Sequence, residues 1–160
     1  MVTCGFCGSE LEINYCSFCD MELEKRYILK DSQRLAQKEL FLGFPNQNEV
    51  FQSTKELMKK ETIDLFCLLR EARRLRAEVF KLRKIKHDAE RDLGKSNNDL
   101  KQLDEATYEE YEYATRKVWV IENIIKDRLG YYPKRISESF INGFVDRIED
   151  SEEKTMIINK

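Results

Sequence analysis

Residues 53–93 read STKELMKKETIDLFCLLREARRLRAEVFKLRKIKHDAERDL, and this stretch predicts most of the fold. Ser53 and Glu56 match a capping box, in which each side chain accepts a hydrogen bond from the backbone amide of the other residue. Apolar residues then recur every three or four positions over about five heptads, which is typical of a coiled-coil-like helix packed lengthwise on another helix. The expected helix over 53–93 has an apolar stripe of Met58, Leu65, Leu68, Ala72, Leu75, Val79, Leu82, Ala89 and Leu93.

The residues after this stretch predict a helical hairpin. Gly94 suits a helix C-cap, and the asparagines that follow it suit a turn. The three-four spacing of apolar residues returns over 99–129, and Gly130 is a second candidate C-cap. Because the connection is short, we expect the two helices to be antiparallel.

A third helix is expected near the C-terminus. Pro133 permits a new helix start, and apolar residues give one face of a helix over 134–149. The whole chain of 160 residues contains only 6 Gly and 2 Pro, and 36% of its residues are charged. Few breakers and many charges favour long helices with solvated faces over a sandwich or a barrel.

Four of the five cysteines lie near the N-terminus in the pattern C-x2-C-x8-C-x2-C. A C-x-x-C turn directs two thiolates at one metal ion, and zinc favours four such ligands in a tetrahedron with Zn–S distances of about 2.3 Å. Redox-active pairs usually lie in a thioredoxin-like α/β context, which this sequence lacks. We therefore expect a structural Zn²⁺ site, with no position left for an activated water, formed by Cys4, Cys7, Cys16 and Cys19.

The segment CGFCGSELEINYCSFCDMEL, residues 4–23, resembles compact zinc-ribbon modules, whose usual form is CxxCG…L…FCxxCG. The resemblance covers residues 1–21 only and implies a small zinc-binding ribbon there. Asp20 stands where these modules have glycine. This difference leaves the four ligands intact and affects only the geometry of the second turn. Such ribbons bind nucleic acid, bind proteins or stabilise a terminus, so the resemblance does not choose among these functions.

The expected fold class is mainly α, with a small N-terminal four-cysteine zinc ribbon followed by a long antiparallel helical hairpin and a C-terminal helix. We expect the ribbon at 1–21 and a connector with short helices at 22–52, with Asp31 as a candidate N-cap. The helical domain is expected at 53–150, and a frayed tail at 151–160.

Charge is distributed unevenly along a chain whose formal net charge is −2. Residues 54–95 carry 13 Lys/Arg and 8 Asp/Glu, a net charge of +5, and both flanking segments are net acidic. One hypothesis is a helix face that contacts nucleic-acid phosphates. We favour the alternative of a solvated face or salt bridges to the acidic second helix, because aromatic interleaving is lacking. The candidate nucleic-acid contacts are Arg70, Arg73, Arg74, Lys81 and Lys84.

Two interpretations of the aromatic residues on and after the second helix remain open. They could form a partner-binding surface, where tyrosine and tryptophan are enriched, or they could pack in and beside the core of a bundle. Their angular spread around the helix means that they do not all face one core. The residues are Tyr108, Tyr111, Tyr113, Trp119, Tyr131 and Tyr132.

The sequence favours a non-enzymatic zinc-binding adaptor or regulator that acts through protein–protein contacts, for example a modulator of transcription or of a host protein. We expect no catalytic residues and no small-molecule substrate, since no phosphate loop, nucleophile elbow or paired-carboxylate motif is present. A homodimer is plausible, and the alternative function is nucleic-acid binding through the ribbon and the basic face at 70–86. With no signal peptide and no run of about 18 apolar residues, we expect no membrane partner and a cytoplasmic location.

Overall fold

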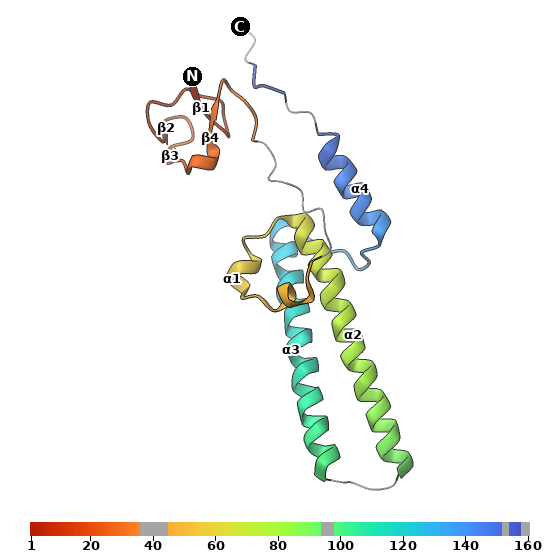
Figure 1. The fold of residues 1–160 in the computed structure, drawn as a ribbon. Helices are drawn as coiled ribbons and strands as arrows, with labels where there is room; N and C mark the ends of the chain where they lie inside the picture. The colour runs from red at the N-terminus through yellow and green to blue at the C-terminus, as the bar shows by residue number, and fades with distance from the viewer. Residues whose placement is uncertain (36–44, 94–97, 152–153, 158–160) are drawn as a thin grey trace. The chain divides into compact units, whose positions relative to one another are not determined.

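The computed structural model describes residues 1–35, 45–93, 98–151 and 154–157 (Figure 1). The chain forms two compact units, of which the first contains Met1–Leu40 and Asp146–Lys160 and the second contains Phe41–Val145. Short antiparallel strands lie near the N-terminus, and long helices follow them. The predicted mainly α fold class is therefore confirmed.

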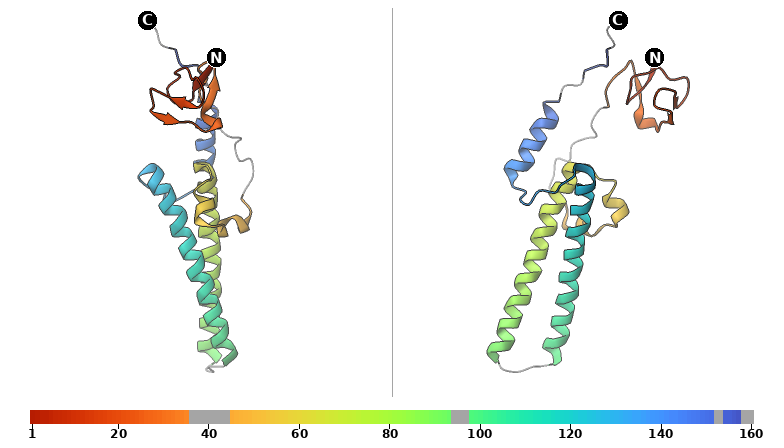
Figure 2. Two further views of the ribbon diagram at one scale, coloured as in Figure 1. Left: turned by 90° about the vertical axis from the view of Figure 1, so that its left-hand side faces the viewer. Right: turned by 180° about the vertical axis from the view of Figure 1, so that it is seen from behind.

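The second unit is built on two long antiparallel helices. Helix α2 spans Thr62–Leu93 and helix α3 spans Asn98–Leu129, and they lie side by side in the views of Figures 1 and 2. The Gly130 amide donates to the carbonyl of Lys126 over 2.8 Å, and Gly130 has φ +79°, so the predicted C-cap of the second helix is confirmed. The expected C-cap at Gly94 lies outside the described residues.

The expected single helix over 53–93 is wrong at its beginning. The capping box of Ser53 and Glu56 is present, but it opens a separate short helix, α1, which spans Thr54–Leu57. Helix α2 begins only at Thr62 because Arg128 binds the backbone carbonyls that end α1. Its guanidinium donates to the Met58 carbonyl over 2.7 Å and to the Lys60 carbonyl over 2.8 Å. These contacts hold the turn between the two helices, and after it the Glu61 carbonyl accepts from the Leu65 amide over 3.1 Å at the start of α2.

The core of the second unit lies at the end of the hairpin where α2 begins. The 3-10 helix η2, Gln47–Phe51, contributes Val50 and α1 contributes Leu57. Helix α4, Glu138–Glu149, contributes Phe140 and Phe144, whose rings pack edge-on against Phe66 of α2. The buried residues are Val50, Leu57, Ile63, Leu65, Phe66, Leu68, Leu69, Ala72, Val118, Ile121 and Ile125.

Helix α4 begins four residues later than the expected start at 134. The Ser137 hydroxyl accepts a hydrogen bond from the Phe140 amide over 3.2 Å, which is the side-chain contact of an N-cap. Before it, Arg73 donates to the carbonyls of Pro133 and Lys134, each over 3.0 Å. The carbonyls of Pro133 and Lys134 thus accept hydrogen bonds from a side chain and not from amides of α4.

The first unit consists of two small antiparallel sheets. Strand β1, Val2–Cys4, pairs with β4, Ile28–Lys30, and strand β2, Tyr15–Cys16, pairs with β3, Met21–Glu22. The 3-10 helix η1, Lys25–Tyr27, lies between β3 and β4. The first residues of the connector expected at 22–52 therefore form the end of β3, the helical turn η1 and strand β4.

Two expectations for the ends of the first unit differ from the structure. Asp31 has φ +52° and no helix begins there, while the rest of the expected short helix lies outside the described residues. In the expected frayed tail, the Met156 amide donates to the Ser32 carbonyl over 2.9 Å, and Arg34 donates to the Lys154 carbonyl over 3.0 Å. This part of the tail is therefore hydrogen-bonded to the unit that carries the cysteines.

A membrane-spanning helix would need a long apolar stretch with few charges, and none of the described helices has one.

Candidate metal centre

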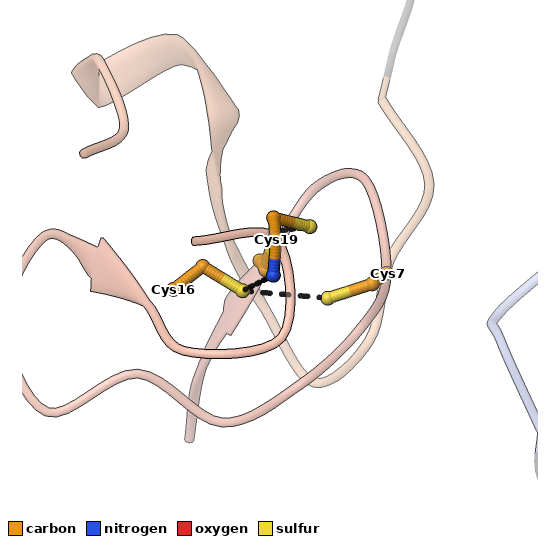
Figure 3. A group of neighbouring side chains, drawn as sticks. Cys7, Cys16 and Cys19 are labelled. Carbon is orange, nitrogen blue, oxygen red and sulfur yellow. Dashed lines mark hydrogen bonds between the residues drawn. The ribbon is translucent and has the colours of Figure 1, made fainter. Parts of the chain in front are cut away.

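The structure brings the four predicted cysteine ligands together in one cluster. All four Sγ atoms lie within 4.8 Å of one another. The Sγ atoms of Cys4 and Cys19 are 3.9 Å apart, and those of Cys7 and Cys16, which face each other in Figure 3, are 3.5 Å apart. A tetrahedron with Zn–S distances near 2.3 Å has S–S edges of about 3.8 Å. The cluster therefore has the size of a four-thiolate metal site.

The thiols are not joined as disulfides. All five cysteines of the chain are free, and the sulfur–sulfur distances in the cluster are far above the roughly 2.05 Å of an S–S bond. The donor set of four thiols around one point suits a soft, tetrahedral ion.

Two similar turns deliver the ligands in pairs. In the first turn the Gly8 amide donates to the Cys4 carbonyl over 2.8 Å. In the second turn the Cys19 amide donates to the Cys16 sulfur over 3.4 Å, as the dashed line in Figure 3 shows. Such a bond stabilises negative charge on the sulfur, which favours the thiolate form that metals bind.

The residue after each turn has a left-handed backbone. Gly8 has φ +76° and Asp20 has φ +52° at the corresponding position of the second turn. Aspartate tolerates this region better than most residues because its short polar side chain can hydrogen-bond locally. Here the Tyr15 hydroxyl donates to the Asp20 carboxylate. Asp20 thus has the same left-handed turn geometry as Gly8 in the first turn.

Substitutions at Asp20 measure how much this turn contributes to metal binding. Asp20→Ala keeps the left-handed strain and loses the carboxylate, whereas Asp20→Gly removes the strain. We expect the alanine variant to bind Zn²⁺ about fivefold more weakly than the glycine variant, which corresponds to about 1 kcal/mol. Competition with a chromophoric chelator measures both affinities, and equal affinities would show that the left-handed turn carries no strain.

The cysteine cluster is also the core of the first unit. Cys4 and Cys16 are fully buried, and Leu11 and Leu23 are the other buried apolar residues around them. The partly buried residues that pack against this group include Cys7 and Cys19. An ion held here therefore joins the parts of a unit that has few other buried side chains.

The thiols of the cluster differ in acidity. The hydrogen bond between Cys7 and the Ser9 hydroxyl, 3.2 Å long, is the main reason that the pKa of the Cys7 thiol is lowered to about 6. The pKa of the Cys19 thiol is raised to about 12, chiefly by its hydrogen bond with Cys7 and next by desolvation. Metal binding to thiols requires the thiolate form, so an ion bound here would displace any protons that the sulfurs carry.

Three of the five candidate nucleic-acid contacts bind acidic or carbonyl groups of this chain. Arg73 lies 2.8 Å from Glu122 of α3 and also donates to two backbone carbonyls. Arg70 lies 3.5 Å from Glu138 of α4. Arg74 pairs with Glu71 and Glu78 on its own helix.

The other two candidates, Lys81 and Lys84, are exposed on α2. Neither residue takes part in an ion pair within the described part of the chain. Only these two lysines of the five candidates are therefore available to phosphates without loss of an internal contact.

Arg73→Ala tests whether this arginine is structural. Its side chain is 20% exposed and that of Glu122 is 16% exposed, so the substitution leaves a poorly solvated carboxylate and two carbonyls without their donor. We expect a loss of about 2–3 kcal/mol in the free energy of unfolding, measured by urea denaturation. Arg74→Ala is the control and should cost less than about 0.5 kcal/mol, because Arg74 is exposed and its pairs lie within one helix.

Comparison of the chain with protein-family models, with curated proteins and with solved structures finds no match. The assignment of the metal centre therefore rests on the four cysteines and on their geometry.

Proposed function

We propose that this chain is a non-enzymatic zinc-binding adaptor or regulator that acts by contacting another protein. The observation that carries this proposal is the cluster of four Sγ atoms within 4.8 Å of one another. Four thiolates fill a tetrahedral zinc ion, so no position is left for a substrate or an activated water. The ion would then stabilise the first unit and would not take part in a reaction.

Exposed apolar side chains on the first unit support a protein partner. Ile13 is 80% exposed and Phe18 is 79% exposed. Phe6 occupies the same position in the first turn as Phe18 in the second, but its ring stacks on Tyr27 with centroids 4.7 Å apart. Phe18 and Ile13 add nothing comparable to the stability of the unit, and large apolar side chains of this kind are enriched in protein interfaces.

Affinity capture from the native source with variants of the full chain tests the proposal. We expect wild-type protein to retain a partner that the double variant Ile13→Ser/Phe18→Ser does not retain. Ile157→Ser is the matched control, because Ile157 is 77% exposed but lies in the C-terminal segment. Each variant must still hold one zinc ion per chain, and equal capture of the partner by the double variant would contradict the proposal.

The second candidate function is nucleic-acid binding, and the exposed lysines of α2 are the observation that favours it. Gel-shift titration at two salt concentrations measures it, because phosphate contacts give a steep dependence on salt. Lys81→Glu/Lys84→Glu is the appropriate variant, since Arg73 and Arg74 already have partners within the chain. Tight binding that this variant abolishes would favour nucleic acid over a protein partner.

A further inference from the structure

The outer part of the α2–α3 hairpin lacks a buried core. Of the side chains that the structure describes, none of α2 after Ala72 and none of α3 before Ala114 is buried. This stretch of α2 is about 30 Å long at 1.5 Å per residue. Its apolar stripe continues with Leu75 and Val79, which are only half-buried. Two helices alone do not cover their apolar stripes, whereas a second pair of helices would.

Aromatic side chains gather on one side of the hairpin, and we call Phe80, Tyr108, Tyr111 and Trp119 the aromatic flank. The first three lie on the outer part, and Trp119 extends the flank to the level of the core. The rings of Phe80 and Tyr111 are 5.7 Å apart, and the Arg83 guanidinium lies 5.0 Å from the Tyr108 ring and 5.9 Å from the Tyr111 ring. Tyr108 and Trp119 are eleven residues apart, so they lie about 20° apart around α3. Phe80, Tyr108 and Trp119 are between 51% and 63% exposed.

Opposite charges accompany the aromatic flank on its two helices. Arg83 of α2 lies 3.7 Å from Asp104 of α3, so the neighbouring Lys84 and Glu105 lie within about 3 Å of one level on these antiparallel helices. Within the described residues, neither Lys84 nor Glu105 takes part in an ion pair. One helix therefore offers an unpaired cation and the other an unpaired anion at nearly one level.

We propose that the aromatic flank is the interface of a homodimer in which two hairpins form an antiparallel four-helix bundle. A two-fold axis parallel to the hairpin places α2 of one copy opposite α3 of the other without changing the level of any residue. Lys84 of each copy then faces Glu105 of the other copy, and the rings of both flanks lie between them. A second copy fits because this chain itself carries both complementary charges. The dimer is independent of the proposed partner of the first unit.

Sedimentation equilibrium of the zinc-loaded full chain tests the proposal. Wild-type protein should have the mass of two chains and should dissociate on dilution. Phe80→Glu and Trp119→Glu should each raise the dissociation constant at least about 30-fold, as loss of an interface hot spot does. Ile85→Glu is the matched control, because Ile85 is 65% exposed on the same helix but lies about 140° around it from Phe80. Circular dichroism of each variant shows whether its helices are intact.

A charge exchange tests the arrangement of the two copies. Lys84→Glu should weaken the dimer, and adding Glu105→Lys to the same chain should restore it, since each new glutamate would again face a lysine. Wild-type protein that stays monomeric at every concentration would overturn the proposal. So would dissociation by Ile85→Glu as strong as that by Phe80→Glu, or a double variant that stays as weak as Lys84→Glu.

Discussion

Cys16→Ser should unfold the first unit and leave the helices of the second unit folded. Cys16 is fully buried in a core that otherwise consists of Cys4, Leu11 and Leu23, so the substitution removes a metal ligand and part of the core at once. Structural zinc sites supply about 10–16 kcal/mol of apparent binding energy, which is also folding energy when no site exists in the unfolded chain. Few other buried side chains are available to hold the two small sheets together.

Three measurements can monitor the unfolding of the first unit in Cys16→Ser. Zinc content should fall from one ion per chain to none, and the dispersed amide resonances of residues 2–31 should collapse in an NMR spectrum. Far-ultraviolet circular dichroism at the helix band should stay almost unchanged, because α2 and α3 belong to the other unit. A chelator added to wild-type protein should have the same effect.

Cys67→Ala is the matched control for the cysteine substitution. Cys67 is buried in α2, far from the cluster in sequence, and burial is the main reason that the pKa of its thiol is raised. Its removal should leave zinc content and the resonances of the first unit intact. Retention of zinc by Cys16→Ser would show that Cys16 is not a required ligand. Loss of most helical signal on chelation would show that the helices of the second unit depend on the ion.

The parts of this protein that were predicted correctly are those in which neighbouring residues determine the structure. The four cysteines lie within sixteen residues, and the spacing of each pair is enough to bring two thiols to one point. Helix α3 was expected at 99–129 and is found at Asn98–Leu129, because its apolar period and the glycine at its end are local signals.

The predictions from sequence fail where a residue far away in the chain determines the local structure. The break between α1 and α2 depends on Arg128, which binds carbonyls 68 and 70 residues earlier in the chain. The hydrogen bond between Met156 and Ser32, and the pairing of β4 with β1, likewise join segments that share no sequence pattern. The partners of Arg73 could not be predicted either, because a lone basic residue in a charged helix gives no signal of its acceptors.

Phe66→Ala should cost the second unit about 3–5 kcal/mol of unfolding free energy, the usual range for a buried phenylalanine. Phe66 is 1% exposed and lies at the centre of the helical core. The rings of Phe140 and Phe144 on α4 meet it edge-on, with centroids 5.1 Å and 5.3 Å away. Truncation would therefore leave a cavity and remove the surface on which α4 packs. Urea denaturation followed by circular dichroism measures the loss.

Leu82→Ala is the control on the same helix, because Leu82 is 57% exposed, and it should cost less than about 0.5 kcal/mol. Phe66→Leu separates the two causes of the larger loss. Leucine fills most of the volume, so this variant should avoid most of the destabilisation that a cavity causes. Because leucine lacks the ring, the variant should still lose about 0.5–1.5 kcal/mol of unfolding free energy for each aromatic pair. If leucine destabilised the unit as much as alanine, the ring contacts with α4 would outweigh the volume. If the leucine variant were as stable as the wild type, apolar burial alone would hold α4. Phe140 and Phe144 would then pack equally well on leucine and on an aromatic ring.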